Sequence, residues 1–259
     1  MNEGPPAVLP LEERAATLPF PPSLPSVSVR DVLIGVPIVW GFVVGVNLMV
    51  LIGLVVVYLV NDGASFLEPP VPLMLGTSFL CLLWANAVAC FFVCRKYGLP
   101  LVRGFALSRV DRKTVRRCVL TGIVTAVGAA VLMGLLARGD SLIAEVASTS
   151  SGLLLFSAFA LLAPPFEEVY YRGFLFPAFR NSVGPRWAVA IVTLWFGLVH
   201  SVQLAGDWAG IPIILVMGGI WTVQRHRSDS LTPSIITHFT YNASLCVLGA
   251  LEVLLEGIA

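Results

Sequence analysis

The chain has 259 residues, of which 57% are hydrophobic and 12% are charged, whereas soluble domains carry about 25% charged residues. This composition excludes an ordinary water-soluble fold. The net charge of +1 excludes a globally basic nucleic-acid-binding protein. We therefore expect an integral membrane protein, with the lipid bilayer as a partner and no nucleic acid.

Residues 1–30 contain seven prolines and show no sustained helical period, a pattern typical of an extended, solvated tail. We predict a Pro-rich disordered cytoplasmic tail over residues 1–30. Residues 31–114 are expected to hold two membrane spans and a basic cytoplasmic loop, and residues 115–255 the remaining spans.

Apolar segments recur along the rest of the chain, each near or above the roughly 17–25 residues that a spanning helix needs. The sequence therefore predicts an all-α fold, a polytopic transmembrane helical bundle of about seven spans. The expected spans are 33–60, 72–94, 118–136, 152–179, 187–204, 209–224 and 231–255, of which 209–224 is the shortest.

The orientation follows from basic residues in the short loops, because Lys and Arg stay preferentially on the cytoplasmic side. The loop after the second span is strongly basic, and alternation from it places the N-terminus in the cytoplasm and the C-terminus outside. Its basic residues are Arg95, Lys96, Arg103, Arg109, Arg112, Lys113, Arg116 and Arg117.

The fourth span carries three charged residues, Glu167, Glu168 and Arg172, inside an apolar run. Each would cost about 2.5–3.5 kcal/mol at the centre of a lipid-facing helix, so these side chains must face protein or water. Glu168 and Arg172 have i,i+4 spacing and can pair on one face. Glu167 is rotated by about 100° on the helix, which leaves it as the freer carboxylate.

Two prolines, Pro164 and Pro165, precede the glutamates. Proline donates no backbone hydrogen bond and collides with the carbonyl one turn earlier, here those of Ala160 and Leu161. We therefore expect a bend in the helix, which could open a wet cavity beside the carboxylates.

Two of the three histidines lie in predicted spans: His200 in the fifth, and His238 in the seventh, one turn before Asn242. Counted at 1.5 Å per residue from the cytoplasmic ends, the depths are about 18 Å for Glu167, about 20 Å for His200, about 11 Å for His238 and about 17 Å for Asn242. Ionisable groups at one depth in a membrane usually mark function. A lone intramembrane His or Asn can instead link helices. The third histidine, His226, falls in a basic loop and is expected to be solvated.

Three short segments carry a family resemblance. The segments EEVYYR, FGLVH and HFTYN resemble, in order, the EExxxR, FxxxH and HxxxN motifs of the CAAX-protease and bacteriocin-processing (Abi) family of intramembrane glutamic endopeptidases. The resemblance covers about residues 115–250, so residues 115–255 would form the catalytic membrane domain.

The resemblance implies that Glu167 activates a water together with His200, while His238 and Asn242 steady the oxyanion. Glu168 and Arg172 would be supporting residues. The implied substrate is a membrane-associated peptide or protein, cut in CAAX-type processing, in bacteriocin or signal maturation, or in surface-protein sorting. The implied location is the bacterial cytoplasmic (inner) membrane.

Other functions stay open at this point. Glu167, His200 and His238 could hold zinc with a water, as in a metalloprotease, but the sequence has no HExxH, so no metal or cofactor is expected. A non-catalytic scaffold or immunity factor would keep the same motifs for folding or for binding a peptide. A transporter would use the glutamates as a proton relay, although the halves show no inverted repeat.

Overall fold

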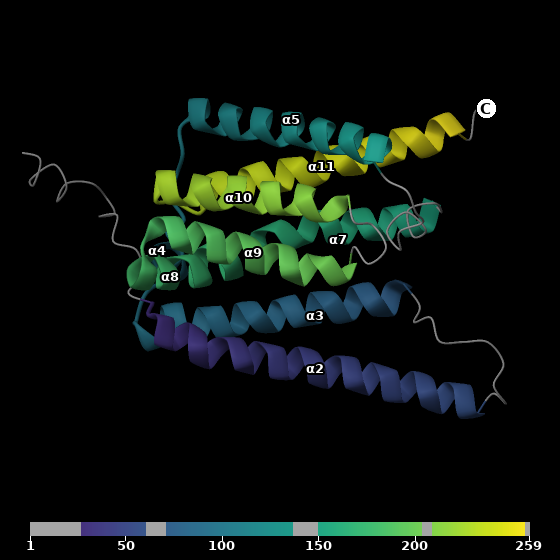
Figure 1. The fold of residues 1–259 in the computed structure, drawn as a ribbon, viewed down its shortest axis with the longest axis horizontal. Coiled ribbons are helices and arrows are strands. Elements are labelled where there is room, and N and C mark those ends of the chain that lie inside the picture. Colours follow the sequence, from purple (N-terminus) through teal and green to yellow (C-terminus); the bar gives the residue numbers. More distant parts are fainter. Residues whose placement is uncertain (1–26, 61–70, 137–149, 204–208, 257–259) are drawn as a thin grey trace, which may run out of the picture.

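The fold comes from a computed structural model, which describes residues 27–60, 71–136, 150–203 and 209–256. Within these ranges every regular element is a helix (Figure 1). The predicted 1–30 tail lies almost entirely outside them. The elements are α2 (Val29–Val60), α3 (Val71–Cys90), η1 (Phe91–Lys96), α4 (Leu101–Gly104), α5 (Arg112–Leu136), α7 (Ser150–Glu168), η2 (Val169–Leu175), α8 (Phe176–Val183), α9 (Pro185–Gln203), α10 (Gly210–Ser228) and α11 (Thr232–Glu256).

The all-helical membrane fold expected from the sequence is confirmed. Within the described residues, five continuous helical stretches are long and apolar enough to cross a membrane: Val29–Val60, Pro72–Lys96, Arg112–Leu136, Gly152–Val183 and Thr232–Leu255. They coincide with five of the expected spans. The expected fifth and sixth spans coincide with α9 and α10, two 19-residue helices outside that set. The count of seven therefore stays a prediction.

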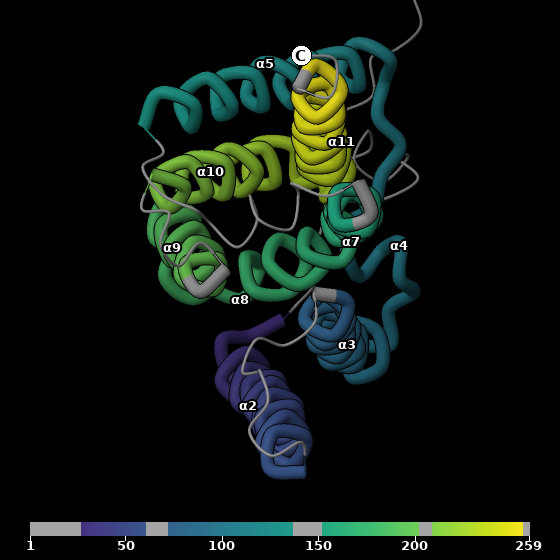
Figure 2. The backbone as a smooth tube through the Cα atoms, turned by 90° about the vertical axis from the view of Figure 1, so that its right-hand side faces the viewer, coloured from purple at the N-terminus to yellow at the C-terminus, as the bar shows by residue number. Residues whose placement is uncertain are grey.

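The long helices run along the longest axis of the molecule (Figure 1), and the end-on view places α2 at one side of the bundle, next to α3 (Figure 2). Helix α11 packs against α5 and α7, and α10 packs against α9. The continuous stretch α7–η2–α8 contacts α3, α9 and α11, so it lies at the centre of the bundle. The two adjacent glutamates sit in this central stretch.

Helix α2 is attached to the bundle at its first turns. Asp31 is fully buried and bonds to Ser28, to the Lys96 ammonium and to the Tyr97 hydroxyl. Beyond Val39 the helix has no buried residue, and it diverges from α3 towards the far edge (Figure 1). An apolar surface of this kind suits contact with lipid.

Hydrogen bonds connect the segment before α5 to the turn between α10 and α11. Ser108 donates from its hydroxyl to Ser230 (2.8 Å) and from its backbone N–H to Thr232 (3.2 Å). Asp111 precedes α5 and accepts from the N–H of Thr114 at 2.6 Å, an N-terminal cap that lowers the pKa of this carboxyl. These contacts fix the start of α11, from which His238 lies about two turns along the helix and Asn242 about three.

Candidate functional site

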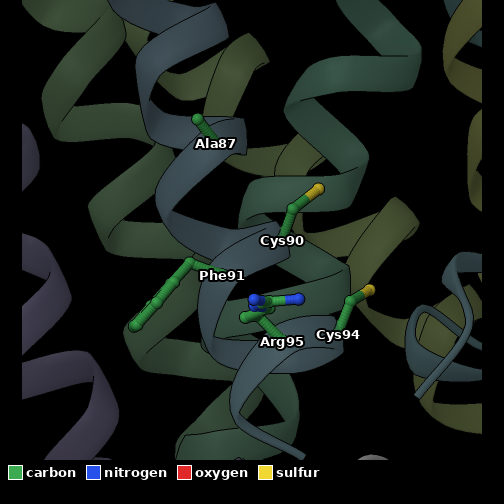
Figure 3. A pocket seen from close by; sticks show the side chains of 5 residues that line it. All are labelled: Ala87, Cys90, Phe91, Cys94 and Arg95. Carbon is green, nitrogen blue, oxygen red and sulfur yellow. The ribbon is translucent and has the colours of Figure 1, made fainter. Parts of the chain in front are cut away.

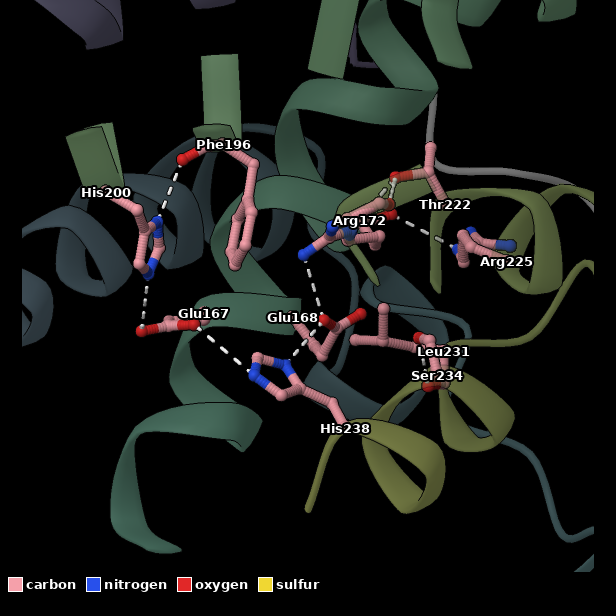
Figure 4. A network of polar contacts seen from close by, with 11 residues as sticks. Glu167, Glu168, Arg172, Phe196, His200, Thr222, Arg225, Leu231, Ser234 and His238 are labelled. Carbon is pink, nitrogen blue, oxygen red and sulfur yellow. Dashed lines mark hydrogen bonds and ion pairs between the residues drawn. The ribbon is translucent and has the colours of Figure 1, made fainter. Parts of the chain in front are cut away.

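The two adjacent glutamates have different surroundings. Glu168 is fully buried. Its Oε1 accepts from Arg172 Nη1 at 2.9 Å and lies 3.0 Å from His238 Nδ1 (Figure 4). The i,i+4 pairing predicted from the sequence is therefore present. Because carboxylates only accept hydrogen bonds, the ring proton of His238 lies on Nδ1. Glu168 thus joins the fourth expected span to α11.

Helix α10 holds the buried guanidinium of Arg172. Nε donates to the Thr222 hydroxyl (3.1 Å) and Nη2 to the Gly218 carbonyl (2.9 Å). A Cβ at position 218 would lie 3.1 Å from Phe196 and 3.4 Å from Arg172, so only glycine permits this approach without a shift. The Phe196 ring covers the guanidinium at 4.6 Å, in cation–π contact. The Arg172 guanidinium is therefore held by three hydrogen-bonded partners, Glu168, Thr222 and Gly218, and by the ring of Phe196.

Glu167 has no such partner within its own helix. Its side chain is 16% exposed and lies between the two histidines, 3.9 Å from His200 Nε2 and 3.7 Å from His238 Nε2. Figure 4 shows the carboxylate between the two rings. These separations exceed a direct hydrogen bond. The structure therefore brings Glu167, His200 and His238 together from three helices.

Contacts behind each ring fix the orientation of the histidines. His200 Nδ1 lies 2.8 Å from the Phe196 carbonyl, which only accepts, so the proton of a neutral His200 ring is on Nδ1. His238 is held in the same way by Glu168 and stacks on Trp221 at 3.6 Å and 15°. Both rings therefore turn Nε2, the nitrogen with the free lone pair when the ring is neutral, towards Glu167. The mutual repulsion of these lone pairs and the carboxylate requires a proton or another hydrogen-bond donor between them.

Two carbonyls that prolines leave without a backbone donor are satisfied by side chains. Pro164 removes the i→i−4 bond to Ala160, and Asn242 Nδ2 donates to that carbonyl at 2.7 Å. In the π-helical turn η2 the bonds run i→i−5, so Pro177 leaves the Arg172 carbonyl free. Arg225 Nε donates to it at 3.2 Å. The proline effect expected at Ala160 is thus present, and it engages Asn242.

Among the described residues, Asn242 is hydrogen-bonded to α7 and not to Glu167 or to a histidine. One of its two amide N–H groups is used in this way. Its assignment to the oxyanion stays a prediction.

The segment 224–227 was expected to be a solvated basic loop, and this expectation is wrong. Helix α10 continues to Ser228, with Arg225 fully buried and the Nδ1 of His226 buried as well. The hydrogen bond from Arg225 to the carbonyl freed by Pro177 explains why the helix stays against the bundle. The positive-inside rule takes account of the charge of Arg225 but not of the Arg172 carbonyl that accepts its hydrogen bond.

The sequence reasoning also missed the contribution of α10 to the site. Gly218, Trp221, Thr222 and Arg225 contact either Arg172 or His238. Their spacing of i, i+3, i+4 and i+7 marks one helix face. The sequence did contain an indication of this contribution. A tryptophan, a threonine and an arginine share one helix face at the end of the shortest apolar segment.

Arg225→Met is expected to leave the free energy of unfolding unchanged or to raise it. Nη1 and Nη2 of Arg225 are buried without a hydrogen-bond partner, and replacing a poorly paired buried charge with an apolar side chain of similar volume is often neutral or stabilising. Thermal unfolding in detergent measures this, with Arg227→Met as the exposed control two residues along α10. A large loss of stability confined to Arg225→Met would show that its single bond to η2 dominates.

The hollow in Figure 3 is separate from this site. It has a volume of about 470 Å³ and is lined by one continuous helix, with Cys90, Cys94 and Arg95 among its residues. No histidine or carboxylate belongs to its lining. It therefore offers no acid–base chemistry.

Comparison with known proteins agrees with the motif resemblance. Residues 149–244 match the family model described as type II CAAX prenyl endopeptidase Rce1-like. The matched range contains all six residues singled out from the motifs: Glu167, Glu168, Arg172, His200, His238 and Asn242. No curated protein and no solved structure matches the chain. The resemblance to the CAAX-protease family is thereby confirmed, because residues 149–244 of this membrane protein match the Rce1-like family model.

Proposed function

We propose that the protein is an intramembrane endopeptidase of the glutamic type, which hydrolyses a peptide bond of a membrane-associated peptide or protein. The family match supports a protease of the CAAX type. The observation that carries the proposal is the position of Glu167, which faces the Nε2 atoms of both His200 and His238 while Glu168 is occupied by Arg172. A free carboxylate beside two oriented imidazoles is suited to general acid–base catalysis.

In the proposed reaction Glu167 is the general base. A water held between Glu167 and His200 gives a proton to the carboxylate as its oxygen attacks the scissile carbonyl carbon. The C–N bond then breaks, and the same proton passes to the leaving nitrogen. One water is consumed, and a carboxylic acid and an amine are released, which then ionise to a carboxylate and an ammonium by transfer of the second water proton. Glu167 returns to its starting charge.

His238 and Asn242 are proposed to donate to the developing oxyanion. Glu168 holds His238 through Nδ1, so a doubly protonated His238 has an Nε2–H available on the Glu167 side. Asn242 has a second amide N–H beyond the one used at Ala160. Donors fixed before the reaction stabilise such charge without reorganisation.

The proposed topology has seven spans, a cytoplasmic N-terminus and a place in a bacterial cytoplasmic (inner) membrane. The basic segment from Arg95 to Arg117 supports this orientation. A reporter fusion at residue 105 is therefore expected to report a cytoplasmic position. A fusion that is exported at that position, with the same fusion at residue 140 retained inside, would reverse the orientation.

Catalysis is proposed to need no metal. Among the residues that the structure describes, no group of three His, Cys, Asp or Glu side chains has the arrangement of a metal site. We expect cleavage to survive strong chelators and purified protein to hold substoichiometric zinc. Activity that is lost on chelation and restored by zinc would instead assign Glu167, His200 and His238 to a metal.

The proteomes of a deletion strain test the proposed function. Membrane and secreted proteins that keep an unprocessed terminal segment in the deletion strain, and lose it when the parent gene returns, are the expected substrates. Complementation with Glu167→Gln should fail. If Glu167→Gln restores the parent phenotype, the protein acts as a scaffold or immunity factor.

A further inference from the structure

A groove on another face of the molecule has no role in the proposed reaction. It has a volume of about 700 Å³ and lies between α5, α10 and the first turn of α11. From α5 it takes residues at i, i+3, i+4 and i+7, beginning with Thr114, and none of the residues in its lining is acidic. None of the six motif residues lines it.

The groove is polar at one end and apolar towards the other. Arg227, the residue before the end of α10, and Arg117, in the second turn of α5, are exposed and mark the polar end. Gly219 and Ile220 line the inner part. From Arg227 to Gly219 the helix rises about 12 Å. The groove therefore reaches from the basic edge of the bundle into the apolar part of α10.

The polar end has unmatched hydrogen-bonding capacity as well as charge. Gln224 lines the groove, and its Oε1 is buried without a hydrogen-bond partner. Buried amide oxygens are normally satisfied, and a rotation of the Gln224 side chain would bring Oε1 to a donor in the groove, such as a lipid hydroxyl. Two arginines without an acidic residue beside them in the groove suit an anion.

We propose that this groove binds one anionic phospholipid. Arg117 and Arg227 would bind the phosphate, Gln224 would accept from a headgroup or glycerol hydroxyl, and an acyl chain would run along Val223 and Ile220. The polarity of the groove follows that of such a lipid, with charge at the membrane edge and hydrocarbon further in. Basic pockets between membrane helices are suited to acidic headgroups.

The position gives the lipid a structural consequence. Thr237 O and Thr240 of α11 approach Gly122 of α5 so closely that a Cβ there would lie 2.8 Å and 2.7 Å from them. A lipid between α5 and α10 would hold the helices on both sides of the start of α11, the helix that carries His238. We therefore expect the lipid to stabilise the folded protein.

The test compares phosphatidylglycerol with phosphatidylcholine of the same acyl chains, added to the full-length protein in detergent. Lipid binding is followed by native mass spectrometry and by the melting temperature. The parent is expected to prefer phosphatidylglycerol. The groove pair Arg117→Gln/Arg227→Gln should bind it about thirtyfold more weakly, since each basic residue near an anionic lipid contributes a factor of about five.

A matched control removes the same charge elsewhere on α5. Arg112 and Arg116 are exposed and do not line the groove, so Arg112→Gln/Arg116→Gln should weaken binding less than threefold. Equal losses in the two pairs, or a parent that binds both lipids alike, would overturn the proposal. Displacement by free glycerol phosphate at the same concentration would overturn it too, because the acyl chain would then be irrelevant. A groove pair with a raised KM for peptide but unchanged phosphatidylglycerol affinity would show that the groove holds substrate instead.

Discussion

Glu168→Gln is expected to destabilise the protein by about 3–5 kcal/mol, because it removes the negative partner of a fully buried arginine. Arg172 and His238 both use Glu168 Oε1. A glutamine could still accept from one of them but would carry no charge. Expression level and melting temperature in detergent measure the effect, and loss of folded protein should precede any kinetic defect.

A paired variant separates the ion pair from the loss of a side chain. Replacing both members, as in Glu168→Met/Arg172→Met, removes the unpaired charge, so this protein is expected to melt above Glu168→Gln. A double variant less stable than the single one would mean that the bonds of Arg172 to Thr222 and Gly218 outweigh the charge. The supporting role given to Glu168 would then belong mainly to Arg172.

Glu167→Gln is expected to lower kcat for peptide cleavage by about 10²–10⁴-fold, the range that general acid–base groups contribute. The substitution keeps the size of the side chain but removes the proton acceptor between His200 and His238. Because Glu167 has no ion pair with a basic residue of its own helix, the melting temperature should stay near that of the parent. Cleavage and melting are measured on one preparation.

The two glutamate variants together decide the assignment of roles. If Glu167→Gln cleaves at near the parent rate while Glu168→Gln is folded and inactive, Glu168 is the base and the roles are reversed. A motif match cannot make this distinction, since it treats adjacent glutamates alike. The distinction comes from helix geometry, which places only one of them one turn before Arg172.

Much of the site could be predicted from the sequence because charged side chains inside apolar segments must avoid lipid and therefore face protein or water. The cost of lipid exposure already required Glu167, Glu168 and Arg172 to face protein, and the i,i+4 rule selected the pair that the structure contains. The freed Ala160 carbonyl followed from Pro164. Local rules of this kind act within one helix, where residue spacing fixes geometry.

Contacts between helices could not be predicted in the same way. That Asn242 would meet the Ala160 carbonyl, or that Arg225 would meet Arg172 O, depends on how α7, α10 and α11 pack. The π-helical turn η2 also has no clear signature in its residues, and without it Pro177 would be expected to free a different carbonyl. The prediction of a loop at 224–227 was wrong because it could not include the contact between Arg225 and the Arg172 carbonyl.

The most direct test of the proposed chemistry is cleavage of a membrane-anchored peptide by purified protein in liposomes. With a substrate taken from the deletion-strain comparison, mass spectrometry of the products should show one peptide bond cut, and in H₂¹⁸O one ¹⁸O atom in the new carboxylate. Glu167→Gln in the same liposomes should give neither product. Equal cleavage by the parent and by folded Glu167→Gln would contradict the account, because the water would then be activated by some other group.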